Sequence, residues 1–329
     1  MAVDLGKVIP NTITTNLNDK IWLFYGEMGT RKTSVACRFP GHLLLCYDIG
    51  YKLINGAMAL PLQNWSDFKS AVKQLDKPEN KERFKCIIID TVGQAYQACY
   101  QYMLTQMGVN DPGEVGYGMG WKKIRLEFES VLRSIPQKGY GLIMLAHSDE
   151  VEKEDKATKQ KKTVIKIDID KRPDLIIKSL ADFVFYLNKE YVEGTDTPTV
   201  FAYTKLIDID TKSRSRYFTP RFEFTYENLQ AELQKAIEKQ CEAENAKSTD
   251  KALDNPYAKQ TVDFDTLKAE NIALANKLMD SPLANEVVDL LTNMLKGVKL
   301  SEIEKSEPAT TTMQVLNSSL LDLEEKLGI

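Results

Sequence analysis

The stretch WLFYGEMGTRKTSVA, residues 22–36, joins an apolar run, a glycine-containing turn and a helix-forming segment. A buried strand, such a turn and a helix together gather several backbone N–H groups around one point, and the helix N-terminus favours an anion there. In this pattern the glycines allow close backbone approach, the lysine reaches the β- and γ-phosphates, and the threonine holds Mg²⁺. We therefore predict a triphosphate-binding loop made of Gly26, Glu27, Met28, Gly29, Thr30, Arg31, Lys32, Thr33 and Ser34.

Arg31 departs from the phosphate-loop pattern, which asks for glycine at this position. If the backbone takes a positive φ here, an arginine costs on the order of 1–2 kcal/mol. If the backbone is close to helical, the cost is small and an extra cation lies beside the phosphates. The sequence leaves both alternatives open, together with the hypothesis that hydrolysis is slowed.

The overall composition is that of an ordinary soluble globular protein, with 329 residues, 43% hydrophobic and 27% charged. No apolar run approaches the roughly 18 residues of a membrane helix, and the first 20 residues lack the pattern of an export signal. A net charge of −4 argues against a globally basic nucleic-acid binder, although a local basic path stays open. Five scattered cysteines and two histidines predict a reducing cytoplasm and no zinc site.

Apolar runs alternate with amphipathic stretches over most of the chain. We expect buried strands at 21–26, 42–48, 84–91 and 139–148, an antiparallel extension at 181–191 and 198–206, and helices at 33–39, 65–77, 94–107, 121–135 and 227–247. Continuous apolar strands separated by helices predict an α/β fold, with a mostly parallel sheet flanked by helices on both faces.

The C-terminal part of the sequence is more polar and less regular. We predict an ATPase core over 1–247, a linker over 248–263, and a small helical C-terminal region over 264–329. Within the last region, 264–298 reads as helical, 301–314 as weakly ordered at best, and 315–329 as one last helix.

Polar residues at the ends of the apolar runs are the candidate site, because ligands of parallel sheets bind beyond the carboxyl ends of the strands. Asp90 ends CIIID, and its carboxylate can hold Mg²⁺ through water. Asp48 either polarises an attacking water or forms a turn towards Gly50. His147 either senses the γ-phosphate or is a hydrogen-bonded histidine at a strand end.

Several segments resemble the RecA-like P-loop ATPases, and more closely the phage-encoded ATP-binding single-strand annealing recombinases. They are YGEMGTRKTS, LLLCYDIGYK, WSDFKSAVKQL, FKCIIIDTVGQAY, YGMGWKKIRLEFESVLRSI, GYGLIMLAHS and FTYENL, within roughly 18–240. The resemblance implies a RecA-like core with ATP and Mg²⁺, bound by Lys32, Thr33 and Asp90. It also implies Asp48 as catalytic carboxylate and His147 as switch residue. The family normally has glycine in place of Arg31 and often glutamate in place of Asp48, which bears on hydrolysis more than on binding.

In RecA-like proteins the loops after the third and fourth strands face DNA, and here these are 108–120 and 149–172. The second loop carries the candidate DNA-binding lysines Lys156, Lys159, Lys161, Lys162 and Lys166. Lysines release counterions from phosphates, and Tyr117 and Trp121 can stack on bases. The alternatives are solvated lysines and a Trp121 that belongs to the core.

A basic stretch follows the last predicted strand. The resemblance implies that Arg214 or Arg216 reaches the nucleotide of a neighbouring subunit, and the sequence does not choose between them. The alternative is a basic turn between edge strands.

We predict an ATP-hydrolysing protein that binds single-stranded DNA and promotes annealing or recombination in phage DNA metabolism. It would act in the cytoplasm of a bacterial host as a homo-oligomeric filament or ring, with a single-strand-binding protein as a further partner and no membrane. The alternatives are a helicase loader or motor of another P-loop class, and a nucleotide-gated interaction protein with weak hydrolysis.

Overall fold

The computed structural model describes residues 10–154, 161–206, 209–251 and 263–327. The chain divides into two compact units, a larger one of Asn11–Ala258 and a smaller one of Met1–Pro10 with Lys259–Ile329. No helix among the described residues is long and apolar enough to cross a membrane.

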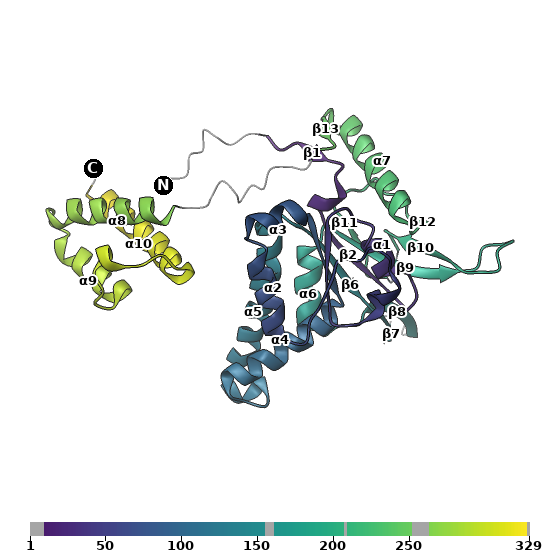
Figure 1. Ribbon diagram of the computed structural model, residues 1–329, viewed down its shortest axis with the longest axis horizontal. Coiled ribbons are helices and arrows are strands. Elements are labelled where there is room, and N and C mark those ends of the chain that lie inside the picture. Colours follow the sequence, from purple (N-terminus) through teal and green to yellow (C-terminus); the bar gives the residue numbers. More distant parts are fainter. Residues whose placement is uncertain (1–9, 155–160, 207–208, 252–262, 328–329) are drawn as a thin grey trace. The chain divides into compact units, whose positions relative to one another are not determined.

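The larger unit is built on a sheet of nine strands that is mostly parallel, as predicted (Figure 1). Its parallel part runs, in spatial order, through β9 (Phe183–Glu190), β2 (Ile21–Gly26), β6 (Gly141–Ala146), β5 (Cys86–Asp90), β3 (His42–Cys46) and β4 (Ala59–Pro61). Antiparallel strands extend the β9 side, namely β10 (Thr199–Tyr203), β12 (Arg221–Glu223) and β11 (Lys212–Ser213). The phosphate-loop strand β2 therefore lies in the middle of the sheet.

Helices cover both faces of this sheet (Figure 1). One face packs against α2 (Trp65–Gln74), α4 (Val92–Met107), α5 (Met119–Gln137) and α6 (Lys171–Leu180), and the other against α1 (Lys32–Ala36) and α7 (Tyr226–Glu244). Along β2, Leu23 and Tyr25 belong to the first core, whereas Trp22 and Phe24 belong to the second. Burial on both faces explains why the strands read as continuous apolar runs.

Shorter elements complete the larger unit. They are α3 (Pro78–Arg83), the 3-10 helices Leu17–Asp19, Gly50–Leu53 and Pro112–Val115, and the two-residue strands β1 (Ile13–Thr14) and β13 (Ser248–Thr249). β1 and β13 pair in parallel, so the predicted linker begins with a paired strand. The 3-10 helix Pro112–Val115 lies in the predicted loop 108–120, where Asp111 and Glu114 form a capping box.

The segment 149–172 was predicted as one loop, and this was wrong. It contains most of an antiparallel hairpin of β7 (Ser148–Glu154) and β8 (Lys161–Ile167), and then the start of α6. Val164 and Ile167 are buried, so apolar side chains anchor β8 despite its lysines. The lysine-rich composition concealed this strand pattern.

The smaller unit consists of α8 (Phe264–Met279), α9 (Ala284–Leu295), the 3-10 helix Leu300–Glu302 and α10 (Glu307–Lys326), with a core of its own. The chain turns between α8 and α9, so 264–298 is not one continuous helix. Weak order over 301–314 was a wrong prediction, because α10 begins inside it. Ser306 caps that helix, Pro308 lies in its first turn, and Met313 is fully buried.

Candidate nucleotide-binding site

The loop between β2 and α1 holds the Lys32 side chain in a buried position, only 6% exposed. Its ammonium group donates to the carbonyl oxygens of Gly26 at 2.7 Å and Glu27 at 2.9 Å, and to the Thr30 hydroxyl at 3.1 Å. All three acceptors are neutral. Burial therefore lowers the pKa of Lys32 to about 8, although the charge of Asp90 acts in the opposite direction. A buried cation held by neutral groups attracts an anion such as phosphate.

Thr33 and Asp90 lie in direct contact at the carboxyl edge of the sheet. The Thr33 hydroxyl donates to Oδ2 of Asp90 at 2.7 Å, which joins the start of α1 to the end of β5. Magnesium prefers such oxygen ligands, and proteins usually hold it through one or two carboxylates together with substrate phosphates and water. The described residues contain no cluster of three or more His, Cys, Asp and Glu side chains that could hold a metal unaided. Thr33 and Asp90 therefore fit a magnesium ion that arrives with phosphates.

The surroundings of the Asp90 carboxyl group disfavour its ionisation. Burial raises its pKa, and the hydrogen bond from Thr33 and the charge of Lys32 offset only part of that effect. A divalent cation would favour the carboxylate form. Thr91 follows, joined by a cis peptide bond, and its side chain caps α4.

The backbone at Arg31 is left-handed, with φ 57° and ψ 20°. The near-helical alternative is therefore wrong, and the arginine carries the conformational cost of a position suited to glycine. Gly29 also has positive φ, at 78°. Gly26 is required for another reason, because a Cβ there would lie 2.3 Å from the carbonyl oxygen of Leu187 on β9. The helix that follows has only five residues and is shorter than predicted.

Asp48 and His147 both lie close enough to influence Asp90 electrostatically. Asp48 is exposed, and its Oδ1 accepts from the backbone N–H of the next residue, Ile49, at 2.6 Å rather than from Gly50. The Nδ1 atom of His147 is buried and has no hydrogen-bond partner among the described residues. The alternative of a hydrogen-bonded histidine at a strand end therefore does not hold for Nδ1 of His147 among the described residues.

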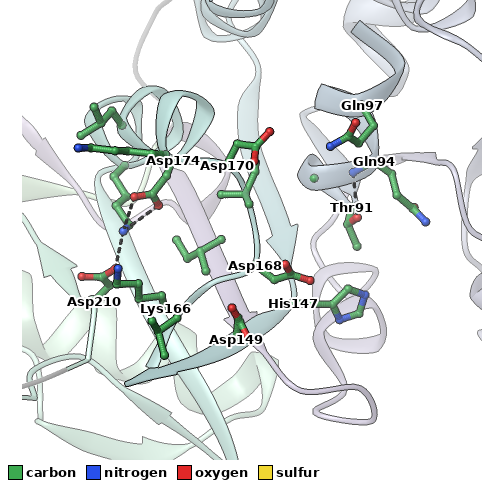
Figure 2. Close-up of a pocket in the computed structure, with 17 residues that line it drawn as sticks. Thr91, Gln94, Gln97, His147, Asp149, Lys166, Asp168, Asp170, Asp174 and Asp210 are labelled. Carbon is green, nitrogen blue, oxygen red and sulfur yellow. Dashed lines mark hydrogen bonds and ion pairs between the residues drawn. The ribbon is translucent and has the colours of Figure 1, made fainter. Parts of the chain in front are cut away.

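A cavity of about 1000 Å³ lies beside this edge, between α4, the β7–β8 hairpin and α6 (Figure 2). Its lining includes Thr91 and His147 but no residue of the phosphate loop. Five aspartates and three lysines line it, so the lining is acidic on balance: Asp149, Asp168, Asp170, Asp174, Asp210, Lys166, Lys171 and Lys178. Lys178 pairs with Asp174 at 2.7 Å and with Asp210 at 2.6 Å, and dashed lines in Figure 2 end on these two aspartates. This acidic surface is poorly suited to the phosphate backbone of DNA.

The candidate DNA-binding lysines are only partly described. Lys156, Lys159 and the Lys162 side chain lie outside the described residues. Lys161 forms an ion pair with Glu152 at 3.0 Å, and Lys166 pairs in register with Asp149 across the hairpin. Acidic residues of β7 therefore offset the described positive charge of β8.

The two aromatic candidates differ in their surroundings. Tyr117 is fully exposed and has φ 49°. The ring of Trp121 packs 5.9 Å from that of Tyr100, and the Arg172 guanidinium lies 4.0 Å from its centroid. Trp121 thus has the surroundings expected of a core residue, whereas the ring of Tyr117 is free to stack on a base.

The two intersubunit candidates also differ. Arg214 forms a 2.5 Å ion pair with Asp182, which in turn accepts from the backbone N–H of Ile21 at the start of β2. That pair lies at the amino edge of the sheet, opposite the phosphate loop. Arg216 is exposed and contacts the Tyr217 hydroxyl at 3.0 Å. Arg214 is thus tied to a carboxylate of its own subunit, whereas Arg216 contacts a neutral hydroxyl.

The structure adds Lys189, which was not identified from the sequence. Its ammonium group donates to the Met28 carbonyl oxygen at 3.0 Å and lies 3.8 Å from Oε2 of Glu27. This contact depends on the pairing of β9 with β2, which the residue pattern around Lys189 does not signal.

A mostly parallel sheet with a phosphate loop after β2 and a contacting aspartate at the end of β5 defines a P-loop NTPase. Comparison with known proteins makes this more specific. Residues 18–223 match the AAA domain family, and the chain belongs to that family.

Two further proteins are similar to this chain. The SPbeta prophage-derived uncharacterized protein YorG of Bacillus subtilis (strain 168) is 28% identical over 259 residues, which cover 74% of this chain and 75% of that protein. The KaiC-like protein PH0186 from the hyperthermophilic archaeon Pyrococcus horikoshii OT3 is 12% identical, with a TM-score of 0.36, and the alignment covers 65% of this chain and 94% of that structure.

Proposed function

We propose that this AAA-domain P-loop NTPase binds Mg²⁺–ATP, hydrolyses it, and uses the nucleotide state to control binding to single-stranded DNA during annealing or recombination. The observation that carries the nucleotide assignment is the joint arrangement of Lys32, Thr33 and Asp90. A desolvated ammonium and a hydroxyl–carboxylate pair meet at one sheet edge, as a metal-bound triphosphate requires.

In this proposal each polar group at the edge has one role. Lys32 binds the β- and γ-phosphates, while Thr33 and Asp90 hold the magnesium ion, which would neutralise charge on the phosphates. Asp48 polarises the attacking water, and its exposed position leaves space for that water. His147 senses the γ-phosphate through the nitrogen that lacks a partner and passes its state to the β7–β8 hairpin, which begins at the next residue.

The DNA-binding part of the proposal relies on exposed groups of the hairpin and of the loop 108–120. Lys161 is exposed, and its pair with Glu152 is a surface pair that exchanges readily with DNA phosphate. Tyr117 offers an uncovered ring for base stacking. A filament or ring would multiply such weak contacts by avidity, with Arg216 reaching the neighbouring nucleotide. Similarity to a prophage-derived protein supports a role in phage DNA metabolism in a bacterial cytoplasm.

The acidic cavity favours a second candidate, a nucleotide-gated interaction protein. Its five aspartates suit a basic protein segment better than DNA. In that case a protein rather than DNA would stimulate hydrolysis.

The test measures ATP hydrolysis with and without single-stranded DNA, followed by electron microscopy with a non-hydrolysable ATP analogue. We expect stimulation by single-stranded DNA and filaments or rings that require both ligands. Lys32→Ala is the control, because it removes the phosphate-binding ammonium and should abolish both results while the fold survives. Nucleotide binding without DNA stimulation or assembly would reject the recombination role and favour the interaction protein. Normal ATP affinity in Lys32→Ala would reject the site itself.

A further inference from the structure

The phosphate loop is approached by a second lysine from the neighbouring strand. The last register pair between β2 and β9 joins Gly26 to Leu187, so β9, which ends at Glu190, continues beyond the end of β2. Leu187 belongs to the core on the α1 face. Lys189 follows two residues later and shares that face, because side chains alternate along a strand. Its ammonium therefore reaches the loop at Met28, 3.0 Å from the carbonyl oxygen.

Lys189 and Lys32 donate hydrogen bonds to the same short segment of the loop. The Lys32 ammonium contacts the carbonyl oxygens of Gly26 and Glu27, and the Lys189 ammonium contacts that of Met28. The two cations are close enough for the charge of Lys189 to disfavour protonation of Lys32. Because Lys32 belongs with the β- and γ-phosphates, Lys189 lies within reach of the same phosphates.

The two lysines differ in how firmly they are held. Lys32 is 6% exposed and makes three hydrogen bonds. The Lys189 side chain is 35% exposed, with one hydrogen bond and a 3.8 Å contact to the Glu27 carboxylate. Exposed pairs of this kind contribute little stability. A phosphate that enters the loop can therefore take Lys189 from its present partners more easily than it can displace Lys32.

The negative charge of Glu27 explains why the loop needs a cation that can pass from protein partners to a phosphate. A carboxylate within a phosphate loop repels the phosphates that the loop must bind, and Lys189 is the cation that lies beside it. Gly29 also borders the ammonium, since a Cβ there would lie in ordinary van der Waals contact with Lys189 Nζ, at 3.7 Å. The loop thus holds a loosely bound cation next to a fixed acidic charge.

We propose that Lys189 is a second phosphate-binding residue. When a nucleotide binds, the Lys189 ammonium moves away from Met28 and Glu27 and contacts the terminal phosphate, so that the site favours triphosphate over diphosphate. This inference rests on the proposed nucleotide site. It adds a residue from β9 to that site and gives the site a means of distinguishing ATP from ADP.

The test titrates the full-length protein with a non-hydrolysable ATP analogue and with ADP, each with Mg²⁺, by calorimetry. Lys189→Met should weaken the triphosphate about tenfold or more, the range for a hydrogen bond to a charged group, and weaken ADP far less. Lys189→Arg keeps the charge and should retain part of the preference. Lys235→Met is the matched control, because Lys235 is an exposed lysine on α7 paired with Glu232, and its variant should behave as wild type.

The outcomes separate this inference from the proposed function. If the wild-type protein binds neither nucleotide, the proposed site itself fails. If the wild type binds both and Lys189→Met leaves the ratio of the two affinities unchanged, only the role of Lys189 is overturned. A melting temperature of Lys189→Met near that of the wild type excludes misfolding as the cause of a change. If that variant does not fold, Lys189→Gln takes its place, with the same loss of preference expected.

Discussion

Replacement of Arg31 by glycine should stabilise the protein. The residue has φ 57° and ψ 20°, a conformation that costs a non-glycine residue about 1–2 kcal/mol. Its side chain is exposed and makes no capping hydrogen bond, so its removal loses little. Glycine adds an opposing term, because the more flexible unfolded chain lowers stability by about 0.4–1 kcal/mol. The net expectation for Arg31→Gly is a gain of roughly 0.5–1 kcal/mol.

A thermal melt followed by circular dichroism in the absence of nucleotide measures this gain. One kcal/mol corresponds to about 2–4 °C in a domain of about this size, so a rise of one to several degrees is expected. Arg31→Ala is the decisive control, because it removes the guanidinium group but keeps the Cβ that causes the strain. Lys296→Gly tests the same conformation elsewhere, since Lys296 ends α9 with φ 50° and ψ 39°.

The strain argument requires the glycine variant to be more stable than the alanine variant. Equal stability of the two would mean that the backbone carries no strain at this position. A gain in Arg31→Ala alone would assign the effect to the positive charge near Lys32. If the arginine also hinders the attacking water, ATP turnover in Arg31→Gly should rise, whereas a fall in turnover would show that the arginine takes part in hydrolysis.

Three further predictions concern charged groups. The pKa of Lys32 is lowered to about 8, and ATP requires its protonated form, so ATP affinity should fall about tenfold per pH unit above 8. Calorimetry between pH 7 and 9.5 measures this, and Lys32→Arg should flatten the dependence because arginine stays charged. Burial raises the pKa of Asp90, so the folded state holds that proton more tightly, and stability is lost as pH rises through the folded-state pKa. Asp90→Asn should therefore melt higher than wild type at neutral pH and lose the magnesium dependence of ATP binding; a lower melting temperature would contradict the account. Replacement of Lys161 and Lys166 by glutamine should weaken single-strand binding and reduce its salt dependence, measured by fluorescence anisotropy, whereas Lys235→Gln should not.

The central sheet could be predicted from the sequence because its strands are buried on both faces. IWLFYG and CIIID are apolar throughout, and residues of both cores alternate along them. The contact between Thr33 and Asp90 also follows from the sequence, since the carboxyl ends of parallel strands meet at one edge.

Other features depend on information that a residue pattern does not contain. Lys189 reaches the loop only because β9 pairs with β2 in one particular register. The β7–β8 hairpin was missed because its lysines and acids hide the buried Val164. In α10, a stretch of threonines masks a helix that packing around Met313 stabilises. Tertiary contacts, rather than local propensity, decide each of these elements.

The protein groups of the site carry two unfavourable charge terms that one ligand would relieve together. Lys32 is a desolvated cation held by neutral oxygens, and the Asp90 carboxyl group resists ionisation. A magnesium-bound triphosphate supplies the anion that Lys32 lacks and the cation that Asp90 lacks. Binding therefore compensates both charges in a single event, and neither free phosphate nor free Mg²⁺ can do so alone. Magnesium and triphosphate should accordingly bind with positive cooperativity, each strengthening the other by the same factor. Additive rises in melting temperature with the two ligands would contradict this physical account of the site.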